Sequence, residues 1–149
     1  MTNFQQQADY NLWATGQWID FIYSNSEHDN YLYKLVNHII KGERAWLERI
    51  NNKDWNRDLW DVAETKQALL KLQEANRVML QQIFEKPLEN RIPVKRLNGQ
   101  EYNPRVMDIL QHAFYHSENH RGQLASFSAK AGLKYPVTDY MTFSIITRL

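Results

Sequence analysis

The chain of 149 residues has no cysteine, only five glycines and four prolines, and almost no net charge. Without cysteine it has no disulfide, no thiolate nucleophile and no thiolate metal ligand, so any metal must be bound by nitrogen and oxygen atoms. The scarcity of glycine and proline, with no proline before Pro87, argues against a turn-rich all-β fold and favours long helices.

Basic and acidic side chains are balanced: Lys and Arg number 18, Asp and Glu 17, and the net charge is +1. This balance leaves no excess positive charge for phosphates or an anionic bilayer, so we expect neither nucleic acid nor a membrane as a partner. No apolar run approaches the ~20 residues that span a bilayer, and the first residues lack the features of a signal peptide. The expected location is the cytoplasm.

Four segments have apolar residues at every third or fourth position, the spacing that places them on one face of a helix. Asn3 is expected to cap the first helix, Pro87 to follow the end of the third, and Asn103 with Pro104 to begin the fourth. A chain of this length is expected to form one domain, residues 1–149, with an all-α four-helix bundle fold. The helices are predicted near residues 3–23, 29–51, 62–84 and 104–132.

Three shorter segments have no helical period. Just before the fourth helix, the pair Asn98-Gly99 predicts a small β-hairpin with a type I′ turn. The connection between the second and third helices contains Trp55 and Trp60, which we expect to pack back on the bundle or to line the mouth of a pocket. The tail beyond Tyr135 is expected to pack across the bundle.

Three of the five histidines, His112, His116 and His120, lie four residues apart on the fourth predicted helix. At ~100° per residue, each step of four turns by only about 40°, so their imidazoles form one ladder. His116 and His120 can point at one cation, as in helices with the H-E-x-x-H motif. A third ligand is expected from a facing helix, and His38, beside the apolar stripe of the second helix, is the candidate.

The alternative is that these histidines are core residues hydrogen-bonded to neighbouring groups, the usual role of a lone histidine on an apolar face. Three neutral imidazoles instead suit a divalent transition metal, Zn²⁺, Ni²⁺, Fe²⁺ or Cu²⁺, and leave coordination positions open for water or substrate. Gly42, one turn from His38, leaves room for a ligand or a neighbouring helix. For His112 we favour a position at the edge of the core over a role as acid or base.

Other polar residues are expected near these histidines. Glu43 and Arg121 could form a charge pair between the second and fourth helices, or each could be a solvated surface charge. The inward amides could orient the ligand imidazoles or bond to backbone instead. These amides are Asn11, Asn76 and Gln123.

Several sequence stretches together resemble the DinB/YfiT family of metal-binding four-helix bundles, over nearly the whole chain. They are YNLWA at 10–14, HIIKGERAWLERI at 38–50, HAFYHSENHRGQLASFSAKAG at 112–132 and PVTDY at 136–140. In that family one histidine opens the motif of the second helix, and two lie on the fourth helix, the second of them beginning the His-Arg-Gly-Gln run. The resemblance therefore implies the ligands His38, His116 and His120.

The resemblance also implies a range of activities, which includes bacillithiol-dependent transferases and a mycothiol-dependent maleylpyruvate isomerase. Their common theme is a metal that activates a low-molecular-weight thiol, because a cation lowers the pKa of a coordinated thiol. Three functions remain open here: a metal-dependent thiol transferase or hydrolase acting on a small molecule, a non-catalytic metal-binding module, and a metal-free structural protein. The open coordination positions favour the enzyme.

The expected assembly is a homodimer. The net charge gives little repulsion, relatives that share the resemblance are often dimeric, and aromatic side chains are enriched at interfaces. Trp13 or Trp18 on the first helix and Phe114 or Phe127 on the fourth are the expected contacts. The alternative is that these rings close the ends of the bundle itself.

Overall fold

The computed structural model describes residues 3–24, 28–54 and 63–148. The four predicted helices are present, each with its ends within four residues of the expected positions, and a two-stranded antiparallel hairpin precedes the fourth. Trp55 and Trp60 lie outside the described residues. The elements are α1 (Asn3–Ser24), α2 (Asn30–Ile50), α3 (Lys66–Phe84), β1 (Val94–Lys95), β2 (Glu101–Tyr102), α4 (Val106–Lys130) and α5 (Tyr140–Arg148).

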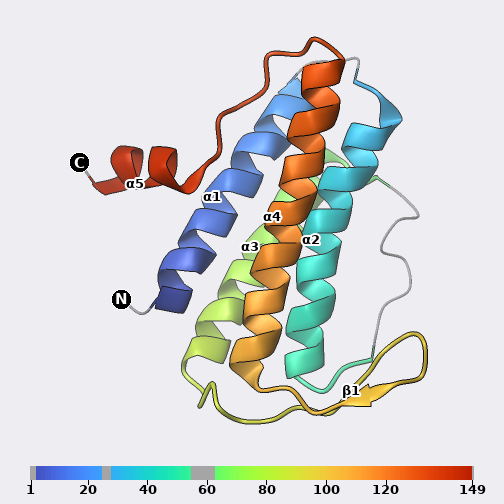
Figure 1. Cartoon of the computed structure of the whole chain (residues 1–149), viewed down its shortest axis with the longest axis vertical. Coiled ribbons are helices and arrows are strands. Elements are labelled where there is room, and N and C mark those ends of the chain that lie inside the picture. Colours follow the sequence, from blue (N-terminus) through green and yellow to red (C-terminus); the bar gives the residue numbers. More distant parts are fainter. Residues whose placement is uncertain (1–2, 25–27, 55–62, 149) are drawn as a thin grey trace.

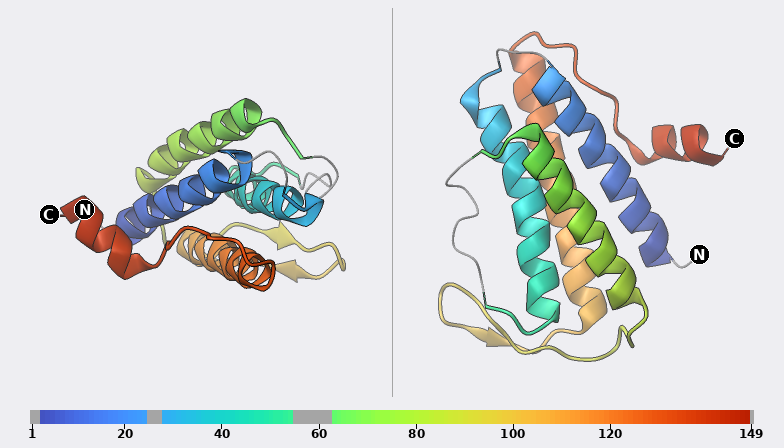
Figure 2. Two further views of the ribbon diagram at one scale, coloured as in Figure 1. Left: turned by 90° about the horizontal axis from the view of Figure 1, so that it is seen from above. Right: turned by 180° about the vertical axis from the view of Figure 1, so that it is seen from behind.

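The four long helices run side by side in an all-α bundle (Figure 1). Seen from above, α1 lies beside both α3 and α4, and α2 lies beside the same two helices (Figure 2). α2 and α4 therefore face each other along the length of the bundle. Within the described residues, none of the helices combines the length and the apolar character needed to cross a membrane.

Apolar side chains form two large core clusters, one on either side of a layer of buried polar residues, and a small third cluster joins α1 to α5. On α2, for example, Ile39 belongs to one cluster and Leu47 to the other, and Glu43 lies between them in sequence. On each of the other three long helices as well, buried polar residues lie in sequence between members of the two large clusters. Members of this polar layer are Asn11, Thr15, Glu43, Asn76 and Arg121.

The turn of the hairpin differs from the expected type I′. A type I′ turn requires a positive φ at both central residues. Gly99 has φ +85°, but Asn98 does not have a positive φ, because Asn52 is the only non-glycine residue with positive φ in the described part of the chain. The Gly99 amide donates to the Arg96 carbonyl (2.9 Å) and the Arg96 amide to the Gln100 carbonyl (2.8 Å). The loop therefore has three residues, with glycine in the left-handed position.

The start of α4 also differs from the expectation. Arg105, not Asn103, occupies the N-cap: its backbone amide donates to an Asp108 carboxylate oxygen at 3.0 Å, and its guanidinium binds the same carboxylate. The carboxylate lies in the first turn, where it also stabilises the helix dipole. Asn3, the expected cap of the first helix, is the first residue of α1 in the described part of the chain.

The tail does not simply cross the bundle, because its last part forms a fifth helix that the apolar pattern did not predict. Tyr135 stacks on Trp18, and the Thr138 hydroxyl accepts a hydrogen bond from the Trp18 indole (3.1 Å). α5 then packs on α1 through Phe143 and extends away from the other helices (Figure 1). The tail is therefore attached along α1.

Candidate metal centre

The imidazoles of His38, His116 and His120 converge in the seam between α2 and α4. Each offers a ring nitrogen, and the three nitrogens lie within 4.8 Å of one another. The Nε2 atom of His116 is 3.4 Å from Nε2 of His38 and 3.1 Å from Nε2 of His120. His38 is buried, whereas His116 and His120 are half-buried, so the group faces outward on the α4 side.

The local sequence explains this convergence. His116 and His120 are four residues apart on α4 and therefore lie one above the other on the same face. Gly42 lies opposite them on α2, and a Cβ atom built on it would lie 3.1 Å from Cε1 of His116. The glycine thus clears the volume that the His116 ring occupies.

A hydrogen bond fixes the ring of His120. Its Nδ1 atom lies 2.7 Å from the Gln123 side-chain oxygen, which accepts hydrogen bonds, so Nδ1 carries the hydrogen. The lone pair of His120 then lies on Nε2, the atom that faces His116. Metal-binding histidines commonly have this arrangement, in which the second ring nitrogen donates to an oxygen. Of the two alternatives considered for Gln123, the structure has the contact with a ligand imidazole, although the side chain is exposed and not inward.

Burial keeps His116 neutral. Its pKa is lowered to about 4, first by removal from water and then by the neighbouring charges of His120, His38 and His112. Neutral imidazole is the form that binds a metal ion. Nδ1 of His116 is buried and has no hydrogen-bond partner among the described residues. The three imidazole nitrogens are the kind of donor that suits a divalent transition metal.

His112, the first histidine of the ladder, does not join this group. Its ring lies edge-on to Trp46 with the centroids 4.6 Å apart, and 6.1 Å from the ring of His116. Its pKa is lowered, first by burial and then by the charge of Arg96. The side chain is thus packed on Trp46 one turn before the converging histidines.

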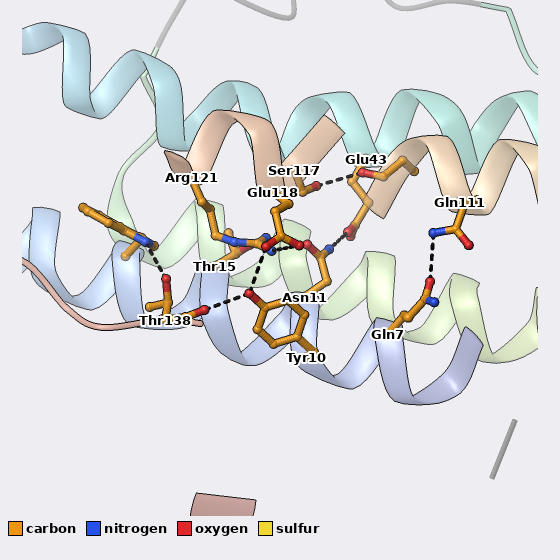
Figure 3. Close-up of polar contacts among 12 residues, drawn as sticks. Gln7, Tyr10, Asn11, Thr15, Glu43, Gln111, Ser117, Glu118, Arg121 and Thr138 are labelled. Carbon is orange, nitrogen blue, oxygen red and sulfur yellow. Dashed lines mark hydrogen bonds and ion pairs between the residues drawn. The ribbon is translucent and has the colours of Figure 1, made fainter. Parts of the chain in front are cut away.

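The polar layer lies inside the bundle, and Figure 3 shows Asn11, Glu43 and Arg121 of three different helices turned toward one another. Arg121 directly follows the candidate ligand His120 on α4. The Arg121 guanidinium donates to the Asn11 side-chain oxygen (2.5 Å) and to the Thr15 hydroxyl (3.0 Å). The Asn11 amide group donates in turn to Glu43 (2.6 Å). Glu43 and Arg121 are therefore both buried and are connected across the helices by Asn11, instead of forming a direct pair or lying in solvent.

Asn11 and Asn76 do not orient the imidazoles, contrary to one expectation from the sequence. Asn76 donates to the other carboxylate oxygen of Glu43 (3.1 Å) and to the Ile40 carbonyl (3.2 Å). Burial raises the pKa of Glu43 to about 7, against the opposing effects of the Asn76 hydrogen bond, the Arg121 charge and the Asn11 hydrogen bond. Both amides thus hold this carboxylate.

Sequence reasoning missed Thr15 and Thr138. Thr15 lies one turn after Asn11 on α1, so its spacing could have placed it beside the Arg121 guanidinium. Thr138 lies in the tail, and its carbonyl accepts a hydrogen bond from the Tyr10 hydroxyl (2.8 Å). Nothing in the local sequence predicts that contact, because it joins residues 128 positions apart.

The fold and the site together define a helical bundle with a three-histidine candidate metal centre between two of its helices. The family model described as "DinB family" matches residues 1–147, nearly the whole chain, and the chain belongs to the DinB family. A comparison with curated proteins found no significant match.

Proposed function

We propose that this DinB-family protein is a cytoplasmic metal-dependent enzyme that activates a low-molecular-weight thiol or water for group transfer or hydrolysis. His38, His116 and His120 would hold one divalent transition ion: Zn²⁺, Ni²⁺, Fe²⁺ or Cu²⁺. The observation that carries the proposal is the convergence of three ring nitrogens within 4.8 Å, two of them on half-buried side chains. Such a site resembles catalytic centres with three protein ligands more than closed structural sites with four.

When bound, the ion would lower the pKa of a coordinated thiol or water, so that its conjugate base forms near neutral pH. The residues of the chain hold and orient the ion. Gln123 fixes the His120 tautomer, and burial keeps His116 in its neutral, ligating form. Because the chain has no cysteine, a nucleophilic sulfur would have to come from a substrate.

The metal is tested first, by elemental analysis of untagged protein equilibrated with Zn²⁺ or Ni²⁺ and then desalted. We expect about one ion per chain in the wild type and none in His116→Ala. His112→Ala is the matched control, because it removes a histidine of the same helix outside the converging group and is expected to keep the ion. Equally little metal in the wild type and in His116→Ala would contradict the metal centre.

The activity is tested separately, by incubating electrophiles with bacillithiol, mycothiol, glutathione or coenzyme A, with and without metal. The proposed enzyme turns over at least one of these thiols, or an ester, only when loaded with metal. A metal-loaded protein that acts on neither thiols nor esters would favour the second candidate, a non-catalytic metal-binding module.

We also propose a homodimer, but with contacts other than those expected from the sequence. Trp18 and Phe114 are buried within the chain, and Trp13 packs against Phe143. Exposed apolar side chains instead gather on the tail and α5, and exposed patches of this kind are typical of interaction surfaces. They are Val137, Met141, Ile145 and Ile146.

A further inference from the structure

A cavity lies between α1 and α3, and none of the three histidines is among its lining residues. It has a volume of about 600 Å³, within the usual range for a small-molecule site. Its lining includes Glu43 of α2, whose side chain belongs to the polar layer, and apolar residues of α1 and α3. The apolar lining includes Leu12, Leu80 and Phe84.

Negative charge predominates in the lining. Asp9, Glu43 and Glu85 contribute carboxylates, and Arg77 contributes the one cation among the described lining residues. The Arg77 guanidinium already binds both carboxylate oxygens of Glu74, at 2.8 and 2.5 Å. The field in the cavity therefore favours a cation over an anion.

Glu43 retains capacity to accept hydrogen bonds. Asn11 donates to one of its carboxylate oxygens (2.6 Å) and Asn76 to the other (3.1 Å), whereas a carboxylate has about four acceptor positions. The hydrogen bonds of the nearest cation, Arg121, go to Asn11 and Thr15. A donor entering the cavity can thus bind Glu43 without displacing an existing partner.

We propose that this cavity binds an organic cation, a primary amine or an amidine that carries an apolar group. Its N–H groups would donate to Glu43, and its apolar part would lie against Leu12, Leu80 and Phe84. A buried carboxylate with apolar walls around it recognises such a ligand by charge and by shape together. This site is separate from the metal centre and does not depend on the proposed enzyme activity.

The experiment compares tryptamine with tryptophol, its neutral hydroxyl analogue, by isothermal titration calorimetry at pH 8. At this pH Glu43, with its pKa of about 7, is ionised. We expect tryptamine to bind about tenfold or more tighter than tryptophol, the difference typical of a hydrogen bond to a charged group. Glu43→Gln should remove this difference, and Glu48→Gln, on the same helix but outside the cavity lining, should preserve it.

Leu12→Trp provides a second variant that leaves Glu43 intact and fills the cavity. We expect it to abolish binding of both compounds. His116→Ala should bind tryptamine as tightly as the wild type, which distinguishes this site from the metal centre. The proposal is overturned if the wild type does not bind tryptamine at millimolar concentration, if both compounds bind equally, or if Leu12→Trp binds like the wild type.

Discussion

Gly42 determines how closely the His116 ring can approach α2. Adding a methyl group in Gly42→Ala would place a Cβ atom 3.1 Å from Cε1 of His116, so the ring must move by a few tenths of an ångström. We expect a loss of metal affinity of roughly tenfold or more, as for changes that disturb the orientation of a ligand. Competition with a chelator of known affinity measures this loss.

The stability of Gly42→Ala should change little, because alanine is better than glycine in a helix by about 1 kcal/mol and this gain opposes the strain. Gly16→Ala is the control, since apart from the backbone of its own helix no described atom lies within 4 Å of the added Cβ. It should raise the free energy of unfolding by about 0.5–1 kcal/mol and leave metal affinity unchanged. Unchanged affinity in Gly42→Ala would show that the ring does not depend on this clearance.

Glu43 makes stability depend on pH. Its pKa is raised from 4.5 to about 7 in the folded state, so the folded chain binds a proton that the unfolded chain has lost between these values. Stability therefore falls as pH rises through this window, by about 3 kcal/mol, and the cost is absent below pH 4.5 where both states are protonated. The lowered pKa of His116 acts in the opposite direction over part of this range, so the effect of Glu43 is isolated by comparing the wild type with Glu43→Gln. In urea unfolding at pH 5 and pH 8, the wild type should lose more stability between the two pH values than Glu43→Gln does, by about this amount.

The candidate ligands could be predicted because they depend on helix geometry, which fixes His116 and His120 on one face. The hydrogen-bond partners of Asn11 and Asn76 could not be predicted from the sequence. An inward amide can bind any polar group that faces it, and the buried carboxylate of Glu43 is a stronger acceptor than a neutral imidazole.

At the scale of elements, the N-terminus of α3 is capped by the side chain of Thr65. The Thr65 hydroxyl accepts a hydrogen bond from the Ala68 amide (3.2 Å), one of the donors that the first turn leaves unpaired. We expect Thr65→Ala to lower the free energy of unfolding by about 1 kcal/mol. Thr65→Ser keeps the hydroxyl and should be close to the wild type, and chemical denaturation distinguishes the two. Equal losses in both variants would assign the effect to the lost methyl group instead.

The four long helices could be predicted because each buries apolar residues that recur at every third or fourth position. The exact ends of the helices are set by capping contacts of individual residues. α5 could not, because its nine residues are too few to show a period and bury little besides Phe143. The hairpin turn shows a similar limit. Asn98-Gly99 fits both a two-residue and a three-residue loop, and hydrogen bonds between Arg96, Gly99 and Gln100 select the second.

At the scale of the whole molecule, the polar layer separates the two large apolar clusters and connects all four long helices. Asn11 of α1, Glu43 of α2, Asn76 of α3 and Arg121 of α4 are linked by consecutive hydrogen bonds. A buried polar group without its partner costs more than the same group paired, so alternative helix registers that break these links are penalised. The layer thereby favours one arrangement of the helices that carry the three histidines.

The proposed dimer can be tested through the exposed side chains of α5. Ile145 and Ile146 are 53% and 60% exposed, and an aspartate at either position would place a charge in any apolar contact made by this helix. We expect light scattering at micromolar concentration to give twice the 17.8 kDa of one chain for the wild type, and 17.8 kDa for the double variant Ile145→Asp, Ile146→Asp.

Leu97→Ser is the control for this test, because Leu97 is 82% exposed and belongs to the hairpin, which lies far from α5 (Figure 1). It should remain dimeric, since it removes exposed apolar area without touching the α5 surface. If the double variant remains dimeric, the interface lies on another surface, because burying two unpaired carboxylates in an apolar contact is strongly unfavourable. A wild type that stays at 17.8 kDa with rising concentration would show that the chain is monomeric and that the exposed face of α5 has no second copy as its partner.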